Sequence, residues 1–248
     1  MSELKQKLEQ LEDAINAACR KAGRLRHDVE LMAVSKTYPA ATIVEAAELG
    51  LRVFGESRVQ EFSAKAPDLS AWRAEGSNAA ADAPLSVHLI GHLQSNKAAR
   101  AVELFDAIDS LDSLRLAERL NEAAAKLRKR LPVLLEIKLS SEETKAGLDP
   151  ESLEVEALLE RLPDLPHLHL RGLMTIAPWG VPDEVTRACF GSLRAWRDRW
   201  AARHPKLQLD VLSMGMSGDF PIAIEEGATR IRVGTALFGK RAPWNGED

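Results

Sequence analysis

The chain has 248 residues, of which 45% are hydrophobic and 28% charged, with a formal net charge of −4. This acidic balance gives no reason to expect nucleic acid or an anionic membrane as the main partner. The two cysteines, Cys19 and Cys189, lie far apart with no C-x-x-C spacing, which argues against a disulfide framework and fits a reducing compartment. The length suits one large core.

The N-terminus is charged and has no apolar h-region of the kind that a secretory signal carries. No stretch of the chain approaches the ~20 apolar residues that a bilayer-spanning helix needs. We therefore expect a cytoplasmic protein without a membrane anchor.

The first expected element is a helix over about residues 2–22, where apolar residues recur at helical spacing with Glu and Lys on the other face. After it, short apolar runs alternate with helical patterns. The expected strands cover residues 30–36, 52–56, 86–91, 104–109, 132–139, 168–175, 209–214 and 230–235. The expected helices between them cover residues 40–49, 57–66, 94–102, 112–129, 150–161, 183–202 and 217–226.

Strict alternation of strand and helix predicts a parallel sheet, and eight such units match a (β/α)8 TIM barrel. The alternative is an open doubly wound sheet, which is less favoured because no G-x-G-x-x-G follows the first strand. We expect a single domain over residues 1–248, interrupted by a mobile surface loop at about 67–86. The first helix would pack on this barrel or against another copy.

Lys36 ends an apolar run, and Thr37-Tyr38-Pro39 breaks the run immediately after it. An amine at the end of a buried strand can lose solvation, and desolvation lowers the pKa of an ammonium group. The neutral amine could then form a Schiff base with a carbonyl cofactor. The alternative is that this lysine simply reaches water from the end of the strand.

Polar residues also gather at the ends of the other expected strands, which is the face of a barrel that carries functional groups. They are Glu56, Ser57, Arg58, Gln94, Asn96, Lys97, Lys138, Ser140, Thr175, Ser213, Ser217 and Thr235. Core packing alone does not require a polar group at so many strand ends.

The last two loops have the composition of a phosphate site. Residues 212–219 supply small side chains, backbone N–H groups and a helix start, and residues 232–235 supply a second glycine turn. Phosphate binds where such groups converge, and in barrels the loops after strands seven and eight often hold it. Ser217 can also be read as a helix N-cap, and the two interpretations are compatible.

Arg232 lies two residues from Arg230, so both share one face of the last strand. A guanidinium inside a barrel needs an acceptor, because arginine does not deprotonate in proteins. That acceptor is either a carboxylate such as Glu136 or a ring nitrogen of a cofactor. In the second case the nitrogen stays unprotonated, and the ring is a poor electron sink. Phosphate site, strand-end lysine and inward arginine together describe pyridoxal 5′-phosphate.

Long motifs carry a resemblance to a known family. They occupy residues 33–37, 54–61, 88–97, 172–174, 212–217 and 231–239, and include Phe54-Gly55-Glu56-Ser57 and Leu212-Ser213-Met214-Gly215-Met216-Ser217. In this order, and nearly end to end, they resemble those of the pyridoxal phosphate homeostasis protein family. The resemblance implies the fold type III barrel, similar to that of alanine racemase.

The resemblance also implies which residues contact pyridoxal phosphate. They are Lys36 through a Schiff base, Ser57, the phosphate contacts Ser213, Met214, Gly234 and Thr235, and Arg232 at the pyridine nitrogen. Ser57 stands where the family usually has asparagine, and its shorter side chain reaches less far. Lys138 stands where a small amide is usual, and Lys145 matches a lysine often present in the family.

The implied function is intracellular vitamin B6 homeostasis, with the cofactor held without efficient catalysis. Pyridoxal phosphate-dependent apoenzymes are the implied partners, and a monomer or weak homodimer is expected. The alternative is a fold type III enzyme such as an amino-acid racemase, which needs two opposed bases. Lys36 can be one base, but the only tyrosine, Tyr38, starts on the same side of the ring. The chain also lacks the length for the racemase's second domain.

Two further interpretations are less favoured. His88 and His92 have a four-residue spacing that suits a metal site on a helix, but here one falls on a strand and the other past its end. The basic run at residues 126–130 closes an expected helix, where cations complement the helix dipole, so it does not indicate nucleic-acid binding. We expect no metal and no nucleic-acid partner.

Overall fold

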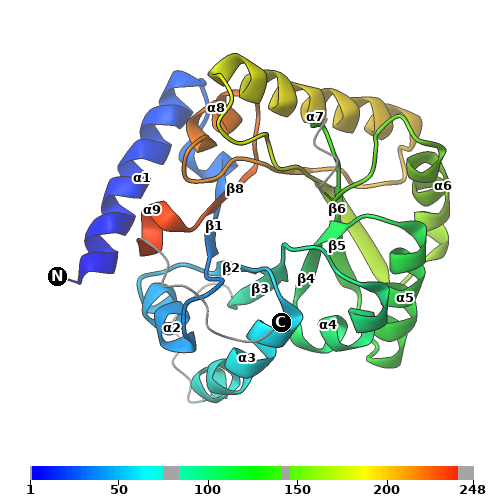
Figure 1. Cartoon of the computed structure of the whole chain (residues 1–248), viewed down its shortest axis with the longest axis horizontal. Helices are drawn as coiled ribbons and strands as arrows, with labels where there is room; N and C mark the ends of the chain where they lie inside the picture. The colour runs from blue at the N-terminus through cyan, green and yellow to red at the C-terminus, as the bar shows by residue number, and fades with distance from the viewer. Residues whose placement is uncertain (1, 75–83, 141–145, 240–248) are drawn as a thin grey trace.

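The computed structural model describes residues 2–74, 84–140 and 146–239. Its eight parallel strands follow one another in chain order around a closed barrel, and β1 pairs with β8 to complete the ring. Figure 1 views this ring nearly end-on, with the helices arranged around the outside of the strands. The predicted (β/α)8 barrel is therefore confirmed, and the open doubly wound sheet is excluded because a closed barrel has no edge strand.

The strands lie close to the predicted positions. They are β1 (Glu30–Val34), β2 (Val53–Glu56), β3 (Ser86–Leu89), β4 (Ala107–Leu111), β5 (Leu131–Glu136), β6 (Leu168–Met174), β7 (Val211–Ser213) and β8 (Arg230–Val233). The α-helices are α1 (Glu3–Lys21), α2 (Ala40–Glu48), α3 (Val59–Ala74), α4 (Ala98–Leu104), α5 (Leu114–Lys126), α6 (Leu153–Arg161), α7 (Asp183–Arg203), α8 (Phe220–Glu225) and α9 (Thr235–Phe238). Short 3-10 helices are η1 (Arg26–Asp28), η2 (Ser95–Lys97) and η3 (Leu162–Asp164).

Helix α1 precedes the barrel and covers the side on which β1 pairs with β8. Ser2 caps it by accepting a hydrogen bond from the Lys5 N–H, and buried Leu11 and Ile15 form its inner face. This face packs on α8 and α9, as Figure 1 shows. Of the two arrangements expected for the first helix, the structure therefore has packing on its own barrel. None of the helices in the described ranges is long and apolar enough to cross a bilayer.

The expected loop at 67–86 is wrong in its first part. Helix α3 continues through Pro67 as far as Ala74, although proline removes a helical hydrogen bond. Leu69 is buried and Trp72 packs against the core, and we attribute the continuation of the helix to this burial. Residues 75–83 lie outside the described residues. Strand β4 also begins later than expected, at Ala107, because the preceding helix runs on to Leu104.

The inside of the barrel is charged near the strand starts. Arg230 donates to Glu30 at 2.5 Å and to Asp109 at 3.0 Å, and His88 Nδ1 lies 3.0 Å from Asp109. Burial raises the pKa of Asp109, but the charges of His88 and Arg230 outweigh it and hold the pKa below its ordinary value. The charged side chains near the strand starts are therefore paired with one another inside the barrel.

Gly172 in β6 tests how tightly the barrel closes. Its φ is +154°, and a Cβ atom there would lie 1.9 Å from the carbonyl oxygen of Val211 in β7. Because that contact is backbone, Gly172→Ala must separate β6 from β7, and we expect a loss of about 3 kcal/mol in unfolding free energy. Urea unfolding measures it. Gly218→Ala, where nothing lies within 4 Å of the added Cβ, is the matched control; equal stability of the two variants would contradict this close approach.

Candidate functional site

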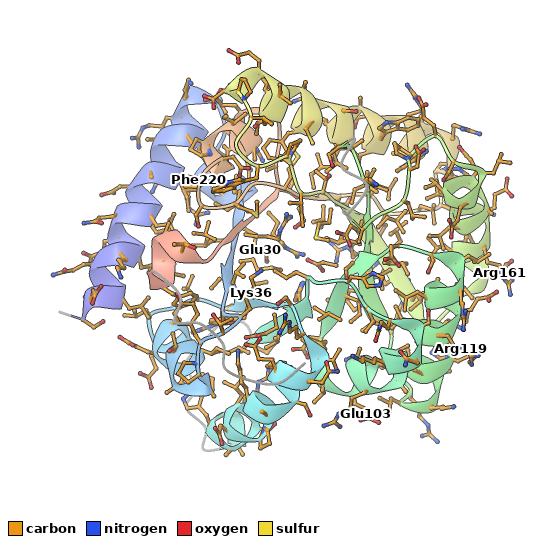
Figure 2. The ribbon with its side chains drawn as sticks, viewed as in Figure 1. Glu30, Lys36, Glu103, Arg119, Arg161 and Phe220 are labelled. Atoms are coloured by element: carbon orange, nitrogen blue, oxygen red, sulfur yellow. The ribbon has the colours of Figure 1, made fainter. Side chains whose placement is uncertain are left out.

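The predicted site residues lie on four neighbouring strands, in the ring order β7, β8, β1 and β2. Ser213 ends β7, Arg232 lies in β8, Lys36 follows the end of β1 by two residues, and Ser57 follows β2 directly. Figure 2 shows Lys36 on the inner side of the ring beside β1, whereas Glu103, which it also labels, lies on the outer rim. The barrel thus brings residues from both ends of the chain to one half of its mouth.

The two loops with the composition of a phosphate site lie against each other. The Ala236 N–H donates to Ser217 Oγ at 3.2 Å, which joins the loop after β7 to the start of α9. The Arg232 N–H donates to the Gly215 carbonyl at 2.9 Å, and Gly215 has a φ of +92°, which suits glycine. In the second loop, Gly234 is buried and Thr235 is exposed.

The N-cap expected at Ser217 is wrong. Helix α8 starts only at Phe220, with Asp219 as its N-cap. Asp219 Oδ1 accepts from the Met216 N–H at 2.5 Å, which folds the loop before the helix. Ser217 is instead engaged with α9, and so contributes to the contact between the two loops.

Arg232 is 4% exposed, and among the described residues its guanidinium donates to two backbone carbonyls and a hydroxyl rather than to a carboxylate. Nη1 donates to Ser213 O at 2.7 Å and Ser213 Oγ at 2.9 Å, and Nη2 donates to Thr175 O at 2.8 Å. Burial lowers the pKa of Arg232, and the charges of Asp109 and Glu136 partly offset this. These bonds use three of the five N–H groups of the guanidinium. The other two have no hydrogen-bond partner in the described part of the chain and are available to a ligand.

Glu136 is 6% exposed, and its Oε2 has no hydrogen-bond partner among the described residues. It lines a cavity of about 250 Å³ at the mouth, together with Ile90, His92, Lys138 and Ile176. Burial raises its pKa to about 7, with the charge of Asp112 adding to the rise. A carboxyl group with a pKa near neutrality therefore lines a cavity formed by residues that follow β3, end or follow β5, and follow β6, and its lining includes neither Lys36 nor Arg232. Lys138 lines the same cavity, and Lys145 lies outside the described residues.

A buried ion cluster near Lys36 was not predicted from the sequence. Lys65 Nζ lies 2.9 Å from Glu56 Oε1 and 2.6 Å from Glu61 Oε1, and all three side chains are buried. Burial raises the pKa of Glu56, and the charge of Lys65 opposes that rise. Glu61 and Lys65 have the i,i+4 spacing of an ordinary exposed helix pair, so only the inward direction of α3 could have revealed them.

Tyr38, the alternative acid of the racemase hypothesis, is turned toward α9. Its hydroxyl donates to the Gly239 carbonyl at 2.8 Å, and its ring packs on Phe238 with a centroid distance of 5.1 Å. The hydroxyl is therefore engaged with backbone. This contact also ties the segment that follows Lys36 to the end of α9.

The residues considered for metal or nucleic acid have structural partners. His92 Nδ1 lies 2.7 Å from Asp112 Oδ2, and His88 belongs to the network inside the barrel. The described ranges contain no group of three or more His, Cys, Asp or Glu side chains that could hold a metal ion. In the basic run, Lys129 donates to the carbonyls of Val102 and Phe105 near the end of α4.

Comparison with known proteins identifies the class of barrel to which the chain belongs. The family model for the N-terminal domain of alanine racemase matches residues 7–242. An alanine racemase of Clostridium difficile superposes with a TM-score of 0.73 at 17% identity, over 99% of this chain and 58% of that one. At this identity the likeness shows the fold alone. The chain is thus a barrel of the alanine racemase N-terminal domain class.

Nearer relatives define the family within that class. The pyridoxal phosphate homeostasis protein of Vibrio cholerae is 41% identical over 97% of this chain and 98% of its own length. The structure of PipY from Synechococcus elongatus with pyridoxal phosphate bound superposes with a TM-score of 0.81 at 43% identity, over 96% of this chain and 100% of that one. The chain belongs to the pyridoxal phosphate homeostasis protein family.

The raised pKa of Glu136 predicts a specific pH dependence of stability. Between pH 4.5 and about 7 the folded chain keeps a proton that the unfolded chain has lost, so this group's contribution to stability falls as pH rises. Glu136→Gln removes this loss, and the variant should gain up to roughly 3 kcal/mol relative to the parent between pH 4.5 and pH 8. Urea unfolding of the ligand-free protein at both pH values measures the gain.

Glu103→Gln on the surface is the control for that experiment, because it makes the same chemical change at an exposed ion pair. A pH-independent difference between Glu136→Gln and the parent would contradict the buried, titrating carboxyl.

Proposed function

We propose that this chain binds pyridoxal 5′-phosphate in the barrel mouth and serves intracellular vitamin B6 homeostasis as a carrier of the cofactor. One observation carries the proposal: a strand-end lysine, a buried arginine with N–H groups to spare and two joined glycine loops share one half of the mouth. The pyridoxal phosphate-bound structure of PipY, similar over nearly the whole chain, supports it.

Pyridoxal phosphate brings an aldehyde that condenses with a primary amine. We assign that amine to Lys36, which is half-buried at the end of β1. Arg232 is assigned to the pyridine nitrogen, since its guanidinium is fixed by Ser213 and Thr175 and retains donors. A guanidinium there keeps the nitrogen unprotonated, so the ring is a poor electron sink, and this fits a carrier and a fold type III racemase alike.

The phosphate is assigned to the joined loops after β7 and β8. Ser213 Oγ accepts from Arg232 and still has its own O–H to donate. Gly234 and Thr235 supply the start of α9, while the Met214 N–H donates to the Arg230 carbonyl, so Met214 fixes the loop. Ser57 faces the same half of the mouth from β2, and we assign it a weaker contact because its side chain is short.

The carrier function is favoured over amino-acid racemisation. A racemase needs a base on each face of the ring, and the Tyr38 hydroxyl is already engaged with Gly239. Relatives that match over nearly their whole length are named homeostasis proteins. We propose transfer of the cofactor to dependent apoenzymes in the cytoplasm by a monomer or weak homodimer. One domain over residues 1–248 remains the prediction.

Covalent trapping tests the assignment of Lys36. Protein incubated with pyridoxal phosphate and then reduced with borohydride should carry the adduct on Lys36, as located by peptide mass mapping. Lys36→Ala should lose most of the trapped adduct, whereas Lys138→Ala, which removes another amine at the mouth, should retain it. An adduct mainly on Lys138 or Lys145 would show that the site is misplaced.

An activity assay separates the carrier from the racemase. Purified protein loaded with pyridoxal phosphate should interconvert L- and D-alanine, serine or threonine far more slowly than an ordinary enzyme, because the second base is missing. Chiral chromatography of the amino acids measures this. Turnover near ~10 per second would overturn the carrier function.

A further inference from the structure

The turn that carries Lys36 holds a strained residue. Thr37 has a φ of +71°, a left-handed conformation that a β-branched side chain rarely adopts. Its Oγ1 is buried without a hydrogen-bond partner among the described residues, so the side chain itself does not stabilise the turn. The conformation therefore depends on contacts made by its backbone and its neighbours.

The buried ion cluster of Glu56, Glu61 and Lys65 makes those contacts on both sides of Lys36. Before the lysine, Ser35 Oγ donates to Glu56 Oε1 at 2.7 Å, and Lys65 Nζ donates to the Ser35 carbonyl at 3.2 Å. After it, the Thr37 N–H donates to Glu61 Oε1 at 2.5 Å. The three charged groups of the cluster thus hold the two residues that flank Lys36.

Lys65 carries a second amine near Lys36, and its hydrogen bonds make it unsuitable for attachment of an aldehyde. Lys65 directs its ammonium at Glu56, Glu61 and the Ser35 carbonyl, which matches its three N–H donors. With all three bonds made, its nitrogen has no lone pair to attack an aldehyde. Charges this deeply buried are costly unless they are paired. Here Glu61 and Lys65 pair with each other and also bond the backbone of Thr37 and Ser35 in the turn that carries Lys36.

We propose that the Glu56–Glu61–Lys65 cluster is a positioning device for Lys36, which holds the strained turn so that the amine meets the cofactor aldehyde in one orientation. The inference rests on the proposed attachment of pyridoxal phosphate to Lys36. It assigns a role to three residues that need not touch the cofactor, and it makes the rate of covalent attachment depend on them.

Glu61→Gln tests the device, because it keeps the shape of the side chain and removes the charge that holds the Thr37 N–H. We expect covalent attachment, followed by stopped-flow absorbance after mixing with pyridoxal phosphate, to slow at least tenfold. Pyridoxine 5′-phosphate has no aldehyde and reports binding without attachment, and its Kd should change less than twofold. Glu3→Gln, in the exposed i,i+4 pair with Lys7, is the matched control and should attach at the parent rate.

A rescue separates positioning from general damage. Glycine adopts the conformation of residue 37 without strain, so adding Thr37→Gly to Glu61→Gln should restore part of the attachment rate. An unchanged rate in Glu61→Gln, or a parallel loss of pyridoxine 5′-phosphate affinity, would overturn the inference. If Glu61→Gln does not fold, Ser35→Ala, which removes one bond to Glu56, is judged by the same two measurements. Failure of the parent protein to attach the aldehyde would instead overturn the proposed function.

Discussion

The pairing of β1 with β8 is the constraint on which the site depends. It makes the first strand, which Lys36 follows, a direct neighbour of the last strand, which contains Arg232. The register pairs Met32 with Arg232, so the backbone of Arg232 lies deeper in the barrel than the turn with Lys36. Tyr38 reinforces this closure through its hydrogen bond to Gly239, and α1 covers the same side from outside.

The charges inside the barrel are arranged by depth. Arg230 pairs with Asp109, which also lies 3.0 Å from His88 Nδ1, and Arg232 is held by the carbonyl oxygens of Ser213 and Thr175 and by the Ser213 hydroxyl. Glu136 lines a cavity at the mouth, and one of its carboxyl oxygens has no hydrogen-bond partner among the described residues. An unsatisfied polar group is costly in a packed core but is tolerated where water or a ligand can enter. The charge pattern thus locates the open end of the barrel independently of Lys36.

The sequence predicted the barrel because periodicity reports strand and helix directly, and eight regular units leave few alternatives. It predicted that polar residues gather at the strand ends, and the ring order β7, β8, β1 and β2 of the structure places Lys36, Arg232 and the glycine loops on neighbouring strands. It failed where tertiary packing overrides local signals: α3 passes through Pro67 because Leu69 and Trp72 are held in the core.

The acceptors of Arg232 and the cluster beside Lys36 could not be predicted from sequence. Backbone carbonyls such as Thr175 O leave no trace in composition, so the sequence favoured a carboxylate or a cofactor for the guanidinium. Glu61 and Lys65 have the spacing of a surface pair, and only the rotation of α3 about its axis turns them inward. Side-chain direction on a helix depends on packing that a single sequence does not encode locally.

The most direct measurement is a crystal structure of the protein grown with pyridoxal 5′-phosphate. We expect continuous density from Lys36 Nζ to the aldehyde carbon, the pyridine nitrogen facing Arg232, and the phosphate in the joined loops after β7 and β8. A cofactor attached to another amine, or a phosphate held away from those loops, would contradict it.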